Sequence, residues 1–382
     1  MNFSFEQGPI RPPSEAQSFL IRVTRNCPWN RCAFCHTYRG TKFELRSVKE
    51  VKADIQEARD KADQVREISW RLGQKGRVTR AVIDRVYGGS GFQSDSLRQV
   101  AAWLYFGGKS VFLQDADSLI MKTGDLVEIL SFIREKFPDV TRITSYCRSH
   151  TARRKSFEEL SMLRDAGLTR IHIGMESGYD PVLKFVKKGV TAAQHIEGGR
   201  KVVASGISLS EYIMPGLGGD KWSRENALQT ARVINEINPD YIRLRSLQVR
   251  IGTDLYRMMK AGAFKPLGDE DVVKEIRLFI ENLEGIESRI VSDHILNLLE
   301  EVEGKLPGDR ERLLGIIDRF FALPEEDRLI YRLGRRRGVY RSLDDLSDTR
   351  TYDVLKGILE QYKDKGSPDL DEDLFRIMHN YI

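Results

Sequence analysis

The chain has 382 residues and a formal net charge of +5, and this length favours one large domain with an appended region over a single small core. No apolar run approaches the length of a membrane span, and the polar N-terminal arm, residues 1–18, does not resemble a signal peptide, so we expect a cytoplasmic protein with no membrane partner. Four cysteines do not make a disulfide-stapled fold of this size, and the charge is too small to indicate nucleic-acid binding by itself.

A cysteine-rich loop follows the first predicted strand, an apolar stretch at residues 19–24. Three of the four cysteines, Cys27, Cys32 and Cys35, lie within nine residues, and this grouping indicates a metal site. A zinc ion would take these three thiolates and His36 as a closed set of four ligands. An iron–sulfur cube held by three cysteines would instead leave one iron without a protein ligand. The loop alone leaves both metals open.

Apolar residues recur at spacings of three and four over residues 48–65, which predicts a helix with Ser47 as its N-cap. Residues 66–108 interrupt this pattern with several glycines and two tryptophans, and we expect them to form a helical insertion of two or three short helices. The insertion either packs as a surface subdomain or forms a lid or wall for the substrate.

Strands and helices alternate regularly after residue 108. This alternation predicts an α/β fold with a parallel sheet and right-handed crossovers, and a partial barrel and a doubly wound sheet both fit it. Residues 291–382 are expected to form a C-terminal helical region. A run of arginines between positions 332 and 341 is expected to face solvent, and the alternative is contact with nucleic acid or another partner. The predicted strands span residues 110–114, 141–145, 169–173, 208–214 and 241–249.

Motifs at the ends of these strands resemble those of a known family. Residues 171–178 read IHIGMESG, residues 212–219 read YIMPGLGG, and residues 252–256 read GTDLY. Together with the cysteine loop and its aromatic residue Phe34, they resemble the radical S-adenosylmethionine (SAM) superfamily. The motifs are similar to the branch that includes the oxygen-independent coproporphyrinogen oxidases and the methylthiotransferases. The C-x4-C-x2-C spacing would mark a subgroup, since the usual spacing is C-x3-C-x2-C.

The resemblance implies a partial (β/α)6 barrel formed by residues 19–65 and 109–290. It also implies a [4Fe–4S] cluster ligated by Cys27, Cys32 and Cys35, with SAM bound to the fourth iron. One electron from an external donor such as flavodoxin or ferredoxin would cleave SAM, and the resulting 5′-deoxyadenosyl radical would take a hydrogen atom from a substrate. The chain would therefore be an enzyme, an oxidoreductase or a related radical enzyme. The single remaining cysteine argues against a second cluster.

The resemblance also suggests residues that contact SAM. It implies that Glu176, at the end of one strand, holds SAM, since a carboxylate accepts from ribose hydroxyls or pairs with the amino group. Met214, at the end of the next strand, lies at a second matched position. We expect Phe34 to pack near the adenine of SAM.

Four other residues near strand ends are candidates for contacts with SAM. Many relatives carry a glycine-rich turn after the second strand, where this chain has two aspartates. We expect Asp115 or Asp117 to accept from the amino group of SAM, and the alternative is a helix N-cap formed by Asp117 or Ser118. Ser145 and Arg148 follow the third strand and are placed to reach the ribose or the carboxylate of SAM, while a surface role for Arg148 stays open.

The substrate is not apparent from any motif. Arg243 and Arg245 alternate with apolar residues in one strand, so one of them, together with Arg22, either faces an acidic substrate or forms a structural ion pair. We favour a small-molecule substrate over nucleic acid. Two alternatives remain, a tRNA- or RNA-modifying radical SAM enzyme and a structural or regulatory zinc protein.

Overall fold

The computed structural model describes residues 4–88, 94–364, 374 and 376–378, and the chain falls into two compact units. The cysteine loop contributes to both, because Cys27 belongs to the first unit whereas Cys32 and Cys35 belong to the second. Unit 1 comprises residues 1–30, 37–173 and 201–209, and unit 2 comprises residues 31–36, 174–200 and 210–382.

Parallel strands form the centre of unit 1. Their order is β1, β4, β5, β6, with Ile21 opposite Leu113 in the first pair and Cys147 opposite Ile173 in the last. The strands are buried along most of their length, which is typical of parallel sheets and explains why they read as apolar runs in the sequence. The bounds are β1 Phe19–Arg22, β4 Ser110–Gln114, β5 Arg142–Cys147 and β6 Arg170–Glu176, and a separate antiparallel pair consists of β2 Thr24–Arg25 and β3 Glu44–Leu45.

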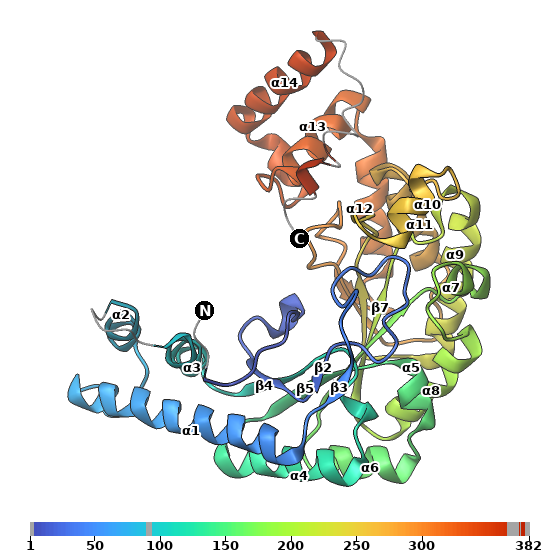
Figure 1. Cartoon of the computed structure of the whole chain (residues 1–382). Coiled ribbons are helices and arrows are strands. Elements are labelled where there is room, and N and C mark those ends of the chain that lie inside the picture. The colour runs from blue at the N-terminus through green and yellow to red at the C-terminus, as the bar shows by residue number, and fades with distance from the viewer. Residues whose placement is uncertain (1–3, 89–93, 365–373, 375, 379–382) are drawn as a thin grey trace. The chain divides into compact units, whose positions relative to one another are not determined.

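Helices α1, α4 and α6 lie along one side of the unit 1 strands (Figure 1). Helix α1 begins as predicted, because the Ser47 side chain and Glu50 form a reciprocal capping box. The predicted insertion contains α2 and α3, whose apolar side chains share one cluster with Val65 of α1. The helices of unit 1 are α1 Val48–Arg71, α2 Arg80–Gly88, α3 Asp95–Tyr105, α4 Thr123–Lys136, α5 Ser149–Arg154 and α6 Phe157–Asp165, with short 3-10 helices η1 Pro13–Glu15 and η2 Ser118–Ile120.

Unit 2 contains a second set of strands. Strands β7, β8 and β9 are parallel, and β10 pairs with β9 in the antiparallel sense. The prediction of an α/β fold with a mostly parallel sheet is therefore confirmed. The predicted strand 241–249 ends earlier, at Leu244, because the Asn297 side chain accepts from the Ser246 backbone and replaces a strand partner. The bounds are β7 Ser208–Ile213, β8 Tyr241–Leu244, β9 Arg289–Val291 and β10 Gly304–Lys305.

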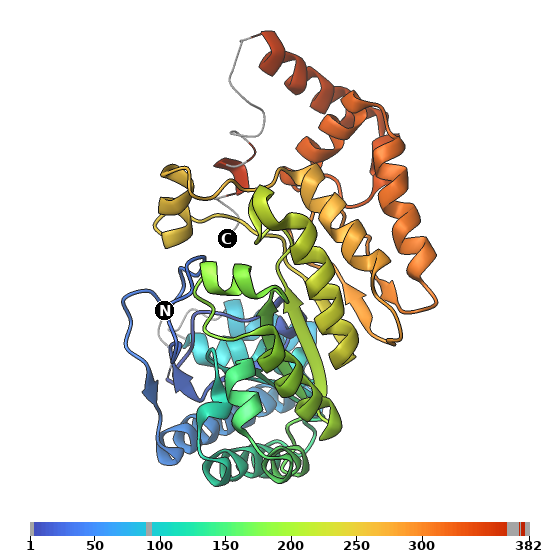
Figure 2. The same cartoon turned by 90° about the vertical axis from the view of Figure 1, so that its right-hand side faces the viewer.

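The helices of unit 2 pack in succession, with α9 on α11, α11 on α12, and α13 on α14. Figure 2 shows α12 to α14 in orange and red, beyond the strands of this unit. No helix among the described residues combines the length and the apolar character needed to span a membrane. The helices are α7 Asp180–Phe185, α8 Ala192–Ala204, α9 Gly219–Ile237, α10 Asp254–Lys260, α11 Asp269–Glu281, α12 Arg310–Ala322, α13 Glu325–Arg336, η3 Leu343–Ser347 and α14 Thr349–Asp364.

The arginines of α13 differ from expectation. Arg332, Arg335 and Arg336 are buried, so the prediction of a solvated face is wrong for them. Arg332 and Arg336 both pair with Asp269 at the start of α11, and Arg335 pairs with Glu300 at 3.0 Å. These ion pairs anchor α13 within unit 2. The predicted domain bounds stay a prediction.

Candidate functional site

Asp115, directly after β4, fixes both flanks of the cysteine loop in unit 1. Its buried carboxylate accepts from Arg22 Nε and Nη2 at 2.9 and 2.7 Å and from the backbone N–H of Asn26 at 2.9 Å. It also accepts from the Tyr38 hydroxyl at 3.0 Å, and burial and the neighbouring carboxylate raise the pKa of Tyr38. Asn26 precedes Cys27 and has the left-handed backbone angle φ 68°. Asp115 therefore holds the chain immediately before the first cysteine.

Asp117 holds the start of α5. It accepts from the Thr151 hydroxyl at 2.5 Å and from the backbone N–H of Arg148 at 3.2 Å. Burial raises the pKa of this carboxyl to about 6, so Asp117 keeps its proton into the mildly acidic range. The role expected for either aspartate, accepting from the amino group of SAM, stays a prediction, and both already have partners inside unit 1.

The two other predicted positions of unit 1 lie close to these aspartates in the fold, because Ser145 of β5 is opposite Leu113 of β4 and the Arg148 N–H donates to Asp117. Ser145 is buried on β5, and its hydroxyl donates to the carbonyl of Tyr146 at 2.9 Å. The guanidinium of Arg148 lies 5.1 Å from the ring centroid of Trp29, in the cysteine loop. A cation over an aromatic ring is a weak attraction, and this contact places Arg148 next to the loop.

The second part of the cysteine loop is fixed within unit 2. The backbone N–H of Ala33 donates to the Val186 carbonyl at 2.8 Å, and the Ala33 carbonyl accepts from Leu255 at 2.9 Å. Ala33, Val186 and Leu255 belong to one buried apolar cluster, and Phe34 packs against it. The Lys188 ammonium lies 5.9 Å from the ring centroid of Phe34. Residues between Cys32 and Cys35 are thus tied to α7 and to the start of α10.

Glu176, at the end of β6, forms part of a charged group in unit 2. Its Oε1 lies 3.0 Å from Lys188 Nζ, and its carbonyl accepts from the Met214 N–H at 2.8 Å. The backbone angle φ of Glu176 is 67°, a left-handed conformation that is uncommon for a residue with a side chain. The structure therefore brings two predicted SAM contacts, Glu176 and Met214, together.

Glu211 on β7 was not predicted. It is fully buried, and neither carboxylate oxygen has a hydrogen-bond partner among the described residues. Burial raises the pKa of Glu211 well above its usual value, the Lys188 ammonium opposes this rise, and the Glu176 carboxylate adds to it. The sequence carried one signal, an acidic residue in the middle of a predicted strand. A buried polar group without a partner is uncommon, and a bound molecule or ion is one of the features that can satisfy it.

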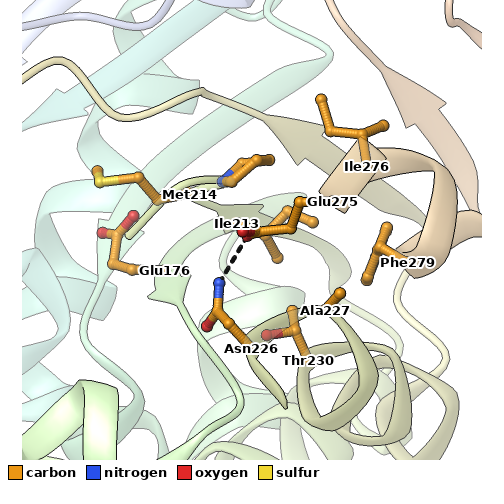
Figure 3. Close-up of a pocket in the computed structure, with 10 residues that line it drawn as sticks. Glu176, Ile213, Met214, Asn226, Ala227, Thr230, Glu275, Ile276 and Phe279 are labelled. Atoms are coloured by element: carbon orange, nitrogen blue, oxygen red, sulfur yellow. Dashed lines mark hydrogen bonds between the residues drawn. The ribbon is translucent and has the colours of Figure 1, made fainter. Parts of the chain in front are cut away.

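A small cavity borders Glu176 and Met214, and Figure 3 shows how its lining side chains meet. Glu275, from α11, accepts from the Gly216 N–H at 3.0 Å and from Asn226 at 2.8 Å. Asn226 in turn accepts from the Ser177 hydroxyl at 2.6 Å. This buried network holds the turn after β7, which carries Met214, against the residue that follows Glu176.

The cysteine side chains have the chemistry of metal ligands. Cys27, Cys32 and Cys35 are reduced and partly exposed, whereas Cys147 is buried like a small apolar residue. Cys27 Sγ accepts from the backbone N–H of Asn30 at 3.4 Å, the type of contact that tunes thiolates in iron–sulfur proteins. Among the described residues, no three His, Cys, Asp or Glu side chains converge on one point as ligands of a single ion. The donor set of three accessible thiols fits a cluster with one open iron.

Residues 89–231 match the sequence profile of the radical SAM superfamily. The chain therefore carries a radical SAM domain. This match confirms the predicted superfamily and the prediction of an enzyme. It also confirms the predicted cofactors, because members of this superfamily bind a [4Fe–4S] cluster and SAM. The subgroup and the oxidoreductase class stay predictions.

Two curated relatives of this radical SAM protein match over limited stretches. The tRNA uridine(34) acetyltransferase of Methanocaldococcus infernus is 30% identical over 122 residues, 32% of this chain and 23% of that protein. Human Elongator complex protein 3 is 29% identical over 116 residues, 30% of this chain and 21% of that protein. The matched stretch thus spans less than a quarter of either relative.

Two of the solved structures that match this chain have low sequence identity to it and TM-scores below 0.5. The archaeal Methanocaldococcus infernus Elp3 with an N-terminal deletion is 20% identical, with a TM-score of 0.40 and coverage of 55% of this chain and 54% of that one. Methylornithine synthase (PylB) is 15% identical, with a TM-score of 0.42 and coverage of 80% and 82%.

These relatives correct one prediction. A small-molecule substrate was favoured over nucleic acid, on the basis of the modest net charge. The archaeal relatives are tRNA uridine(34) acetyltransferases, and a tRNA is a nucleic acid, so this preference is wrong. Net charge misleads here because 61 basic and 56 acidic residues nearly cancel over the chain, whatever their local arrangement.

Proposed function

We propose that this radical SAM protein modifies RNA, with tRNA as the first candidate. The observation that carries the proposal is the 30% identity, over 122 residues, to an archaeal tRNA uridine(34) acetyltransferase. This chain also matches the radical SAM profile. The proposal includes abstraction of a hydrogen atom from the RNA, since this is the chemistry that the superfamily resemblance implies. It also includes an external one-electron donor. A cytoplasmic location is part of the proposal as well, and the reduced cysteines support it.

Cys27, Cys32 and Cys35 are the proposed ligands of the cluster. When bound, the reduced cluster supplies the electron that cleaves SAM to methionine and a 5′-deoxyadenosyl radical. Ser145 and Arg148 of unit 1 and Phe34, Met214, Glu176, Lys188 and Glu211 of unit 2 are proposed to bind SAM. In unit 2, the buried carboxylate of Glu211 is suited to accept from an ammonium or hydroxyl group, and the Glu176–Lys188 pair is suited to orient a zwitterion.

The proposed function predicts products that can be measured directly. Anaerobically purified protein should be brown, contain four irons per chain as its cluster requires, and form 5′-deoxyadenosine when given dithionite and SAM. Addition of an unmodified tRNA transcript should increase 5′-deoxyadenosine formation and add mass to the tRNA or remove it, as detected by nucleoside mass spectrometry. A colourless protein that holds one zinc would refute the enzyme, and unmodified tRNA under turnover would refute the RNA substrate.

Replacement of Glu211 with leucine should separate ligand binding from stability. Leucine has a similar size but no polar atom, so it removes a buried group that has no partner within the described part of the chain. We expect the free energy of unfolding to stay equal or rise, because an unsatisfied buried group is costly. SAM affinity should fall by about tenfold to a hundredfold, the equivalent of one hydrogen bond to a charged group.

Equilibrium dialysis with labelled SAM measures this affinity, and iron content should not change. Glu236→Leu serves as a control, because Glu236 is exposed and pairs with Arg200 at the surface. A Glu211→Leu variant that is unstable yet binds SAM normally would show that Glu211 has a structural role instead.

A further inference from the structure

Arg245 is the one of three predicted substrate-facing arginines that remains without a partner in the described part of the chain. Arg22 pairs with Asp115 and Glu6, and Arg243 donates to Ser210 at 3.1 Å and pairs with Asp293 at 3.3 Å. The side chain of Arg245 is half-buried and makes no hydrogen bond or ion pair with any other described residue. A guanidinium that is partly removed from water needs an anion to compensate the lost hydration.

Arg245 lies beside the proposed SAM contacts of unit 2. Its backbone N–H donates to the carbonyl of Ile213 at 3.0 Å, next to the register pair of Ile213 and Leu244. Arg245 is therefore the neighbour of Met214 at the carboxyl ends of β7 and β8. Ligands of parallel α/β proteins bind at this edge, so the position is one where a substrate can reach the side chain.

The loops after β8 and β9 hold Arg245 close to His294. Asn297 bridges them, because its side chain donates to the Leu244 carbonyl at 2.8 Å and accepts from the Ser246 N–H at 3.0 Å. His294 Nδ1 accepts from the Leu296 N–H at 3.2 Å, so the ring proton of neutral His294 sits on Nε2. Burial and the guanidinium of Arg245 lower the pKa of His294 to about 3, which keeps the ring neutral. His294 therefore offers one neutral N–H donor next to a cation.

A second guanidinium, that of Arg250, lies on the same loop. Burial and the charge of Arg245 both lower the pKa of Arg250, so the two cations are close enough to repel each other. Like charges held together by the fold favour an anion between them. A phosphate group has a negative charge and several acceptor oxygens, so it can accept hydrogen bonds from two guanidinium groups and an imidazole N–H at the same time.

We propose that Arg245, with Arg250 and His294, binds a backbone phosphate of the RNA substrate. The proposal rests on the proposed function, because it takes RNA as the source of the phosphate. The other anion available at this edge is the carboxylate of SAM, and binding measurements separate the two. Arg245 would place the RNA strand beside the SAM site while leaving the chemistry to other residues.

The test measures binding of a fluorescent, unmodified tRNA transcript to the full chain over a range of KCl concentrations. Arg245→Gln should bind about tenfold more weakly, and the slope of log affinity against log salt should decrease in magnitude by about one, as expected for one lost phosphate contact. Arg245→Lys should retain most of the slope, because the charge remains. Arg200→Gln, which removes an exposed arginine paired with Glu236 in the same unit, should leave affinity and slope unchanged.

Thermal unfolding verifies that each variant is folded, and removal of an unpaired half-buried charge should not lower the midpoint. Equal affinities and slopes for Arg245→Gln and Arg200→Gln would overturn the proposal alone. Weaker SAM binding by Arg245→Gln with unchanged tRNA binding would also overturn it, and would assign Arg245 to the SAM carboxylate. A wild-type chain without salt-dependent tRNA binding would overturn this proposal and the RNA substrate together.

Discussion

Replacement of Cys27 with alanine is expected to abolish iron binding and the formation of 5′-deoxyadenosine. A [4Fe–4S] cluster with three protein thiolates has no spare ligand, so loss of one leaves two irons without protein coordination. The remaining thiols, Cys32 and Cys35, are partly exposed and have no fourth cysteine beside them in the loop. The same loss is expected for alanine at either of these two positions. Iron and sulfide analysis of anaerobically reconstituted protein, together with chromatography of the SAM cleavage products, measures the effect.

Cys147→Ala is the matched control, since it removes the one thiol outside the loop. Cys147 is buried on β5, and burial raises its pKa, so the thiolate form that binds metals is disfavoured. This variant should retain four irons per chain, as the cluster formula requires, and retain SAM cleavage. Full iron content in Cys27→Ala, or equal loss in both variants, would contradict the proposed ligand set.

Local patterns in the sequence were sufficient for several features of this radical SAM protein. The spacing of three cysteines, the Ser47 capping box and the burial of the parallel strands each depend on residues close together in the chain. The acidic residue at position 176 was found because it ends a recognisable strand motif. Such features can be predicted because neighbouring residues alone determine them.

Features that depend on distant residues could not be predicted in this way. Glu211 is isolated because the strands around it supply no donor, which only the folded arrangement reveals. Arg243 and Arg245 look alike in the sequence, yet Asp293 pairs with one of them and not with the other. Arg336 is buried because Asp269, far away in the chain, supplies its counter-charge. Pairing over such sequence distances has no local signature.

Sequence and structure predict different outcomes when Asp115 is replaced. From the sequence, alanine at both Asp115 and Asp117 would weaken SAM binding and leave the iron in place, because one of the two carboxylates was expected to meet the amino group of SAM. In the structure, the Asp115 carboxylate is buried and bonded to Arg22, Asn26 and Tyr38. These partners flank the cysteine loop on both sides within unit 1. The iron content of an Asp115 variant therefore distinguishes the two roles.

Asp115→Ala is expected to destabilise the iron-free chain by about 3–5 kcal/mol, the range found when one partner of a buried ion pair is removed. The guanidinium of Arg22 would lose its buried counter-charge, and the Asn26 N–H and the Tyr38 hydroxyl would lose their acceptor. Because the residue before Cys27 is then no longer held, iron incorporation should also fall. Denaturant unfolding and iron analysis measure the two effects.

Asp84→Ala is the control, since Asp84 pairs with Arg80 on the exposed face of α2 in the same unit, and its loss should change stability by at most about 0.5 kcal/mol. Asp115→Asn keeps one carbonyl oxygen but no charge, so it should fall between the wild type and Asp115→Ala in both stability and iron content. If Asp115→Ala instead keeps its iron and its stability while SAM affinity decreases, the carboxylate serves the ligand, and the anchoring role is refuted. Loss of iron at unchanged stability would mean that the loop is held mainly from its unit 2 side, through Ala33.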